Sequence, residues 1–297
     1  MHSIFQLSEE KMNYFDFHCD TVTALADGRA TAVRPGEGVP FEKYTQAFAI
    51  WLNDETSPDA AFKKAGEYYG FFKEHILSFA QKGFKPFLTL ENAVSFGNRL
   101  ENVSIWKKRG VRAVTLTWNG ANALGFGSSF PDGGGLTSFG KAALAEMNRL
   151  KIIADVSHIN KRGFYDCISL SKAPVIASHS NCAALCRHQR NLDDEQIKAL
   201  FSVGGLLGIC FYPLFLGSGN VFELVYEHVC HALELGGENL LCFGSDFDGA
   251  EMDERLNSPK KVLKLYHFLS KKGFDEKLLN KIFYSNAQNF YSGFCAS

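Results

Sequence analysis

Six residues with metal-binding or acid–base side chains occur at the ends of short apolar segments of this sequence. They are His18 and Asp20 in FDFHCD, Glu91 in FLTLEN, His158 in IADVSH, His179 in VIASHS and Asp246 in LCFGSDFDG. Imidazole nitrogens and carboxylate oxygens bind Zn²⁺ at about 2.0–2.2 Å. Three histidines and two or three carboxylates can hold two metal ions about 3.5–4 Å apart, with one carboxylate bridging them.

A structural role is the simpler interpretation of each such residue taken alone. A single histidine at a strand end is typically a hydrogen-bonded structural residue, Asp155 suits a helix cap, and Asp248 suits the DFDG turn. Cys182 and Cys186 have helical spacing but lie in an apolar stretch, and the six remaining histidines, including His188, are interpreted as surface or packing residues. The metal site is favoured because six suitable residues follow five different predicted strands.

Short apolar segments alternate with amphipathic ones along the whole chain. Strands are predicted over residues 14–18, 45–51, 86–90, 112–117, 152–155, 175–178, 205–210 and 240–244. Helices are predicted over residues 60–81, 94–108, 138–150, 161–170, 193–201, 222–235, 259–271 and 276–283. This alternation is typical of a parallel sheet covered by helices. Eight strands in 297 residues favour an α/β fold, one (β/α)₈ TIM barrel spanning 1–297 with a short N-terminal extension.

A barrel would bring the six residues together, because the carboxyl ends of its strands meet at one mouth, where barrel active sites lie. Alternate side chains of an extended chain share a face, so we expect His18 and Asp20 side by side. The glycine-rich segment 121–135 follows a predicted strand and is expected at the same mouth. No GxGxxG pattern connects a predicted strand to a helix, which argues against a dinucleotide site.

The charge balance gives no reason to expect a nucleic acid or an anionic membrane as partner. The chain has 31 basic and 32 acidic residues and a formal net charge of −1, so a small polar substrate is the natural expectation. Its eight cysteines are scattered without a CxxC pair and are expected to be reduced. The first residues lack the apolar core of a signal peptide, and no segment approaches 18 apolar residues; we therefore expect a cytoplasmic protein.

The order of the motifs resembles that of the membrane (renal) dipeptidase family, a branch of the metal-dependent amidohydrolase-like barrels. The motifs are FDFHCDT, LTLENA, VTLTWNGAN, DVSHIN, PVIASHSNCAALCRHQRNLDDEQI and GSDFDG. The resemblance extends from about residue 15 to the C-terminal end, and the combination of SHS, the following RN and GSDFDG is its most specific part.

This resemblance implies a role for each matching residue. It implies two Zn²⁺ ions, with His18 and Asp20 on one, His158 and His179 on the other, and Glu91 bridging both. It also implies that Asp246 is the catalytic acid–base group and that Arg190 binds the substrate's carboxylate. A guanidinium presents a planar fork that matches a carboxylate, although Arg190 considered alone would be a solvated charge beside a helix.

Trp118 is a departure from the family pattern. Renal-type relatives carry a histidine where TLTW has this tryptophan, and that histidine is thought to stabilise the oxyanion of the tetrahedral intermediate. An indole offers an N–H donor without a charge, and Asn119 and Asn122 are further candidate amide donors. Loss of one such donor can cost about 2.7–4 kcal/mol. The predicted substrate-binding residues are thus Arg190, Trp118 and Asn119.

The expected activity is hydrolysis of dipeptides, L-D as well as L-L, by a metal-activated hydroxide. Zinc lowers the pKa of bound water to about 7, and Asp246 would pass a proton to the departing amine. One alternative is a related barrel amidohydrolase that cleaves a lactam or another small amide, and a second is a non-catalytic metal-binding protein. A homodimer is expected from the family resemblance.

Overall fold

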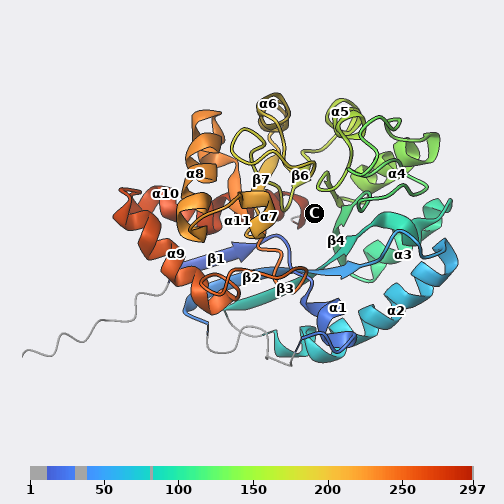
Figure 1. The fold of residues 1–297 in the computed structure, drawn as a ribbon. Coiled ribbons are helices and arrows are strands. Elements are labelled where there is room, and N and C mark those ends of the chain that lie inside the picture. The colour runs from blue at the N-terminus through green and yellow to red at the C-terminus, as the bar shows by residue number, and fades with distance from the viewer. Residues whose placement is uncertain (1–11, 31–38, 81–82, 296–297) are drawn as a thin grey trace, which may run out of the picture.

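Eight parallel strands form a closed barrel in the computed structural model, which describes residues 12–30, 39–80 and 83–295 (Figure 1). In chain order they are β1 (Met12–Asp16), β2 (Phe41–Trp51), β3 (Phe84–Glu91), β4 (Val111–Thr115), β5 (Ile153–Asp155), β6 (Ile176–Ala177), β7 (Leu206–Ile209) and β8 (Leu241–Phe243). Each strand pairs with its chain neighbours, and the pairing of Asp16 with Phe243 joins β1 to β8 and closes the ring. The (β/α)₈ barrel predicted from the sequence is confirmed.

Helices surround the barrel, with α2 and α3 on one side of Figure 1 and α8, α9 and α10 on the other. The α-helices are α1 (Thr21–Ala26), α2 (Pro58–His75), α3 (Leu100–Lys108), α4 (Ser138–Arg149), α5 (Lys161–Leu170), α6 (Asp194–Ser202), α7 (Pro213–Leu216), α8 (Val221–Glu234), α9 (Pro259–Lys271), α10 (Glu276–Asn280) and α11 (Asn286–Cys295). Short 3₁₀ turns occupy Leu77–Phe79, Ala93–Phe96 and Gly237–Asn239, and a π turn at Lys281–Ser285 connects α10 to α11. Within the described ranges, each helix is too short or too polar to cross a bilayer.

Local sequence sets where several helices begin. Asp193 accepts the backbone N–H of Gln196, whose side chain in turn accepts the Asp193 N–H, so a capping box starts α6. The side chains of Thr137 and Asn160 cap α4 and α5 by accepting one backbone N–H each from the first turn of the helix. These caps end the loops that follow β4, β5 and β6, and thereby set the length of chain available at the mouth.

Two apolar cores hold the barrel together. The larger lies between strands and helices and includes Trp106, Ile50 and Phe283, all fully buried. The smaller fills the barrel interior, where Phe15 and Phe17 of the first strand segment contact Phe87 of β3. Aromatic residues of α11 pack against this inner cluster, so the interior below the mouth is filled by side chains.

The predicted helices and strands are present in the structure, but several of their ends differ. All eight strands exist, but β1 ends at Asp16, two residues before the predicted end. The predicted helix 94–108 starts too early: α3 covers only Leu100–Lys108, and Gly97, with a φ of 55°, separates it from a preceding 3₁₀ turn. The predicted helix 60–81 is too long, since α2 ends at His75. The expected N-terminal extension, residues 1–11, and residue 81 lie outside the described residues.

α1, α7 and α11 were not predicted. The first two are only six and four residues long, too short for a periodic pattern. The predicted helix 276–283 corresponds to α10 and part of the π turn, after which α11 continues in a different register.

Candidate metal centre

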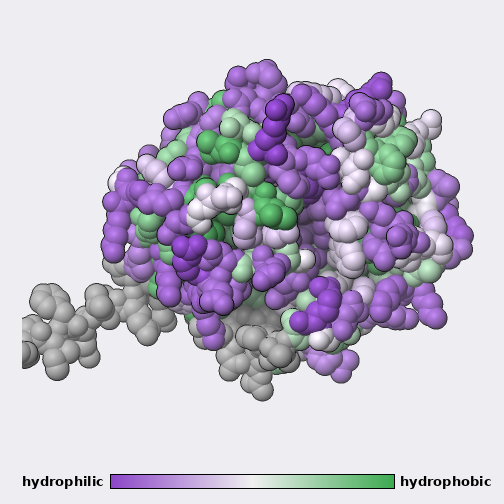
Figure 2. Space-filling view, in the orientation of Figure 1, coloured by the Kyte–Doolittle hydropathy of each residue, from purple (hydrophilic) through white to green (hydrophobic). Residues whose placement is uncertain are grey.

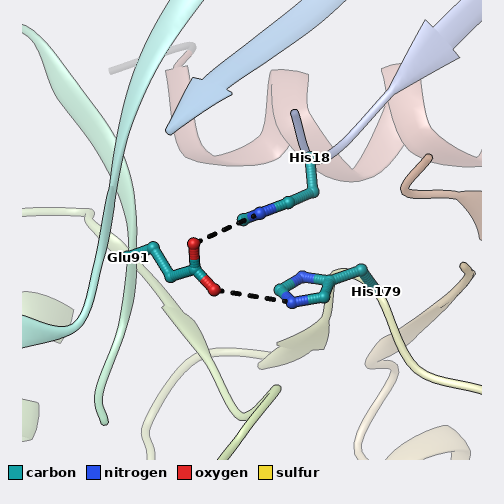
Figure 3. A group of neighbouring side chains, drawn as sticks. All are labelled: His18, Glu91 and His179. Carbon is teal, nitrogen blue, oxygen red and sulfur yellow. Dashed lines mark ion pairs between the residues drawn. The ribbon is translucent and has the colours of Figure 1, made fainter. Parts of the chain in front are cut away.

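The six candidate ligand and acid–base residues converge at the carboxyl-terminal mouth of the barrel. Glu91 ends β3 and faces two neighbouring histidine rings, His18 after β1 and His179 after β6 (Figure 3). Its Oε2 atom is 3.5 Å from His18 Nε2, and its Oε1 atom is 3.8 Å from His179 Nε2. One carboxylate thus faces two separate imidazoles, one with each oxygen.

The first half of the cluster contains His18 and two more carboxylates. His18 Nε2 lies 3.3 Å from Asp20 Oδ2 and 3.8 Å from Asp246 Oδ1. The Nε2 atom of His18 and the Oδ1 atom of Asp20 are buried, and neither has a hydrogen-bond partner within the described residues. Buried polar atoms are almost always satisfied in proteins. These atoms fit a metal ion, which would supply the missing partner.

The second half contains two histidines that face each other. The Nε2 atoms of His158 and His179 are 2.9 Å apart, and His158 Nε2 is 2.8 Å from Glu91 Oε1. Three ligand-type atoms from β3 and the loops after β5 and β6 therefore point to one place. Their types and convergence fit a divalent ion of the zinc class.

The chain leaves β1 before the ligands, yet remains held beside β8. Cys19 forms an isolated parallel bridge with Phe247, the Asp246 N–H donates to the His18 carbonyl, and the Asp20 N–H donates to the Phe247 carbonyl. His18 and Asp20 are adjacent as predicted, but these bonds, and not the strand itself, set their positions. Asp246 has a φ of 65°, an uncommon conformation for a residue with a Cβ that is enriched at functional sites.

Hydrogen bonds from behind fix the orientation of the histidines. His179 Nδ1 lies 2.8 Å from Ser178 Oγ, which donates to Asp155 Oδ2 at 2.5 Å. His158 Nδ1 lies 2.9 Å from Asn119 Oδ1. In both rings the remaining nitrogen, Nε2, faces the centre. Ligand histidines in metalloproteins are typically oriented in this way.

Burial and mutual repulsion shift the acid–base behaviour of the cluster. Burial, and next the Asp20 carboxylate, raise the pKa of Glu91 to about 8, while burial also raises the pKa of Asp246 to about 7. Burial lowers the pKa of His158 and of His179 well below the usual histidine range, so both rings are neutral and able to bind a metal. Burial opposes the charged form of His18 too, but Glu91 and Asp20 raise its pKa well above the usual range.

Arg190 is a buried cation at the same mouth. The residue is only 4% exposed to solvent. Its Nη2 donates to the His179 carbonyl at 3.2 Å, and its guanidinium lies 5.2 Å from the centre of the Phe215 ring. Its Nε has no hydrogen-bond partner within the described part of the chain. A buried guanidinium with unused donors is suited to an anionic ligand.

A cavity of about 390 Å³ opens over the cluster and contains Arg190 and Trp118 in its wall. Figure 2 shows apolar residues over α7 beside a hollow in this face. The wall also includes residues that were not predicted to contribute: Arg29, Trp51, His188, Tyr212 and Phe215. His188 was interpreted as a surface or packing residue, but it borders the cavity. Trp51 is the last residue of a predicted strand, and that position was a signal for it.

The asparagines after β4 have structural partners. Asn119, predicted to bind substrate, borders the cavity, but its Oδ1 contacts His158 Nδ1 and accepts from Ser128. The Asn122 amide donates to Asn92 Oδ1 and to the Leu116 carbonyl, so it holds the loop and is not part of this cavity wall. Cys182 is likewise a packing residue, fully buried with its thiol against the His228 carbonyl.

Sequence comparison with known proteins identifies a dipeptidase family. The family model described as membrane dipeptidase (Peptidase family M19) matches residues 72–291. An uncharacterized protein in the pqqA 5′ region of Klebsiella pneumoniae is 32% identical over 66% of this chain and 77% of its own length. An uncharacterized dipeptidase of Schizosaccharomyces pombe is 36% identical over 47% of this chain but only 36% of its own length.

Solved structures agree. A family M19 metallopeptidase described as dipeptidase AC has a TM-score of 0.86 and 26% identity, with 95% of this chain and 98% of that chain covered. A metallopeptidase from Rhodobacter sphaeroides, liganded with a phosphinate mimic of the dipeptide L-Ala-D-Ala, has a TM-score of 0.81 and 26% identity, with 95% and 99% covered. With the family model covering most of its length, this chain belongs to the membrane dipeptidase family, Peptidase family M19.

Proposed function

We propose that this chain hydrolyses the peptide bond of dipeptides, including L-D dipeptides, with two zinc ions held at the mouth of the barrel. The dipeptidase activity itself follows from the family. The proposal of two zinc ions rests on the position of Glu91, whose two oxygens face different histidines within one buried cluster. A carboxylate in this position can serve two ions at once.

The two zinc ions would share Glu91. His18 and Asp20 would hold one, and His158 and His179 the other, on the sides of the carboxylate where each residue lies. Bound zinc lowers the pKa of water towards neutrality and polarises a carbonyl group. The protein supplies a buried setting that keeps His158 and His179 neutral.

Asp246 would transfer the proton from the attacking water to the departing amine. Burial brings its pKa to about 7, where a carboxyl group can accept and release a proton at neutral pH. Its Oδ1 lies near His18, at the edge of the cluster, and its Oδ2 lies 3.7 Å from the Cys210 thiol. It also borders the cavity and is accessible to a substrate.

Arg190 would bind the substrate's terminal carboxylate. Its unused donors and burial favour an anion over water, and its position at the cavity wall would bring that anion near the cluster. A substrate fixed at its carboxylate, with its amide over Glu91, has room for few further residues in a cavity of about 390 Å³. The phosphinate ligand of the Rhodobacter sphaeroides structure mimics an L-D dipeptide, which supports the inclusion of D residues at the second position.

Purified protein would be tested by metal analysis together with amino-acid release from L-L and L-D dipeptides and a β-lactam. We expect about two zinc ions per chain, hydrolysis of dipeptides and loss of activity after chelation. Asp246→Asn should keep the metal and lose most turnover. Retained zinc with near-normal turnover in that variant would contradict the acid–base role, while cleavage of the β-lactam alone would favour the amidohydrolase alternative. The homodimer and the cytoplasmic location stay predictions.

A further inference from the structure

Trp51 and Trp118 form an aromatic pair beside the metal cluster. Their ring centres are 5.2 Å apart with an angle of 76° between the planes, an edge-to-face contact. Both side chains border the cavity and are partly exposed in the structure. Trp118 also lies close to a ligand histidine, with its ring centre 6.2 Å from that of His158.

The strand register explains why Trp51 faces the site. Trp51 is the last residue of β2 and pairs with Glu91, the last residue of β3. Paired residues of neighbouring strands project to the same face of a sheet, so the indole is directed to the same side as the central carboxylate. Trp118 follows β4 and completes the wall on the other side of β3.

The opposite wall of the cavity is the one with the carboxylate-binding residue. Arg190 lies in the loop after β6, and Phe215, which stacks on it, lies in α7 after β7. In a closed ring of eight strands, β2 stands across from β6. By this strand order the tryptophan pair and Arg190 lie on opposite sides of the mouth.

We propose that Trp51 and Trp118 bind the side chain of the substrate's amino-terminal residue and favour a large apolar or aromatic one. The proposal rests on the proposed function, in which Arg190 holds the carboxyl end of the dipeptide and the scissile amide lies over Glu91. A dipeptide in that position directs its amino-terminal residue to the opposite wall. Burial of an aromatic or branched side chain against two indoles is favourable, whereas alanine leaves most of that surface uncovered.

One basic side chain also borders the cavity. Arg29 follows α1 and borders the cavity on the side of β1 and β2. Its guanidinium would disfavour a lysine or arginine side chain in the same cavity. The wall therefore selects by apolar contact, and its preference is for phenylalanine or leucine.

The test is a comparison of L-Phe-D-Ala with L-Ala-D-Ala in the zinc-loaded wild type, in Trp51→Ala and in Trp51→Phe. The wild type should favour the L-Phe substrate in kcat/KM by about tenfold or more. Trp51→Ala should remove most of this preference through a higher KM for the L-Phe substrate, and Trp51→Phe should restore much of it. Phe130→Ala, which changes an aromatic residue 46% exposed on the loop after β4, is the matched control and should leave the ratio unchanged.

Metal content and thermal unfolding, measured for each variant, separate a lost pocket from a damaged site. An unchanged ratio in Trp51→Ala with normal metal content would overturn the pocket while leaving the dipeptidase intact. A wild type that prefers L-Ala or a lysine-containing substrate would overturn it as well. Failure of the wild type to cleave either dipeptide would overturn the proposed function first, and the pocket with it.

Discussion

Ser178 Oγ donates to Asp155 Oδ2 at 2.5 Å and also lies 2.8 Å from Nδ1 of His179. A carboxylate at the end of β5 is thereby connected through a hydroxyl to a candidate metal ligand after β6. Asp155 also accepts the backbone N–H groups of Ser157 and Ser178 through Oδ1, so it ties the two loops that carry His158 and His179.

Replacement of Asp155 by Asn should weaken metal binding without removing a ligand. The amide cannot accept all the hydrogen bonds that the carboxylate accepts, so His179 loses its fixed orientation. Loss of such supporting bonds typically lowers metal affinity about 10–100-fold. The measurement is competition with a zinc chelator, with Asp132→Asn, in an exposed part of the loop after β4, as control. Equal affinities for Asp155→Asn and the wild type would disprove the supporting role.

Replacement of Glu91 by Gln should reduce the zinc content to one ion or fewer per chain. The amide keeps the size of the side chain but offers a single oxygen, so it cannot face both halves of the cluster. Zinc is measured by elemental analysis after extensive dialysis, with Glu74→Gln, whose side chain is 78% exposed, as control. Two ions retained in Glu91→Gln would contradict the bridging role.

The function of Arg190 can be isolated by altering protein and substrate together. Arg190→Met should lower kcat/KM for a dipeptide by about 10–100-fold, the value of a charge-assisted hydrogen bond of about 1.5–3 kcal/mol. A dipeptide amide, which lacks the carboxylate, should be a poor substrate for the wild type and lose little more in the variant. If Arg190→Met lowered kcat/KM for the dipeptide amide by as much as it lowers kcat/KM for the dipeptide, Arg190 and the carboxylate would not interact.

The pH dependence of the metal-free protein should report on Asp246. Burial raises the pKa of this carboxyl from 3.8 to about 7, so the folded state holds the proton more tightly than the unfolded state does. The stability that this group contributes is complete below about pH 4 and is lost as the pH rises towards 7. The free energy of unfolding of the wild type should therefore fall with pH relative to that of Asp246→Asn. Denaturant titrations at several pH values measure this difference, and a constant difference from pH 4 to 7 would contradict it.

Much of the fold and of the cluster could be predicted because both depend on local sequence. Each ligand-type residue follows an apolar segment, and a parallel barrel brings the ends of such segments to one mouth. The supporting contacts could not be predicted in the same way. Asp155 suits a helix cap, but Asn160 caps α5, and Asp155 instead bonds Ser178 across the strand pair β5–β6.

The cavity wall shows the same limit. Trp51 becomes part of the site only through its register with Glu91 on the neighbouring strand. The register between residues 40 positions apart cannot be predicted from either segment alone. Asn119, predicted to bind substrate, borders the cavity, but its contact with His158 depends on a loop whose path sequence patterns do not define. Pairings over long sequence distance are thus what the structure adds.

The packing of α11 has a consequence for the end of each reaction cycle. Phe15, Phe17 and Phe87 precede His18 and Glu91 on their own segments, and α11 lies against them, so the barrel is sealed beneath the cluster. Both liberated amino acids must exit through the opening by which the dipeptide entered. The amino acid released from the carboxyl-terminal side keeps the carboxylate that Arg190 is proposed to bind, so it should compete with incoming substrate and slow turnover as it accumulates.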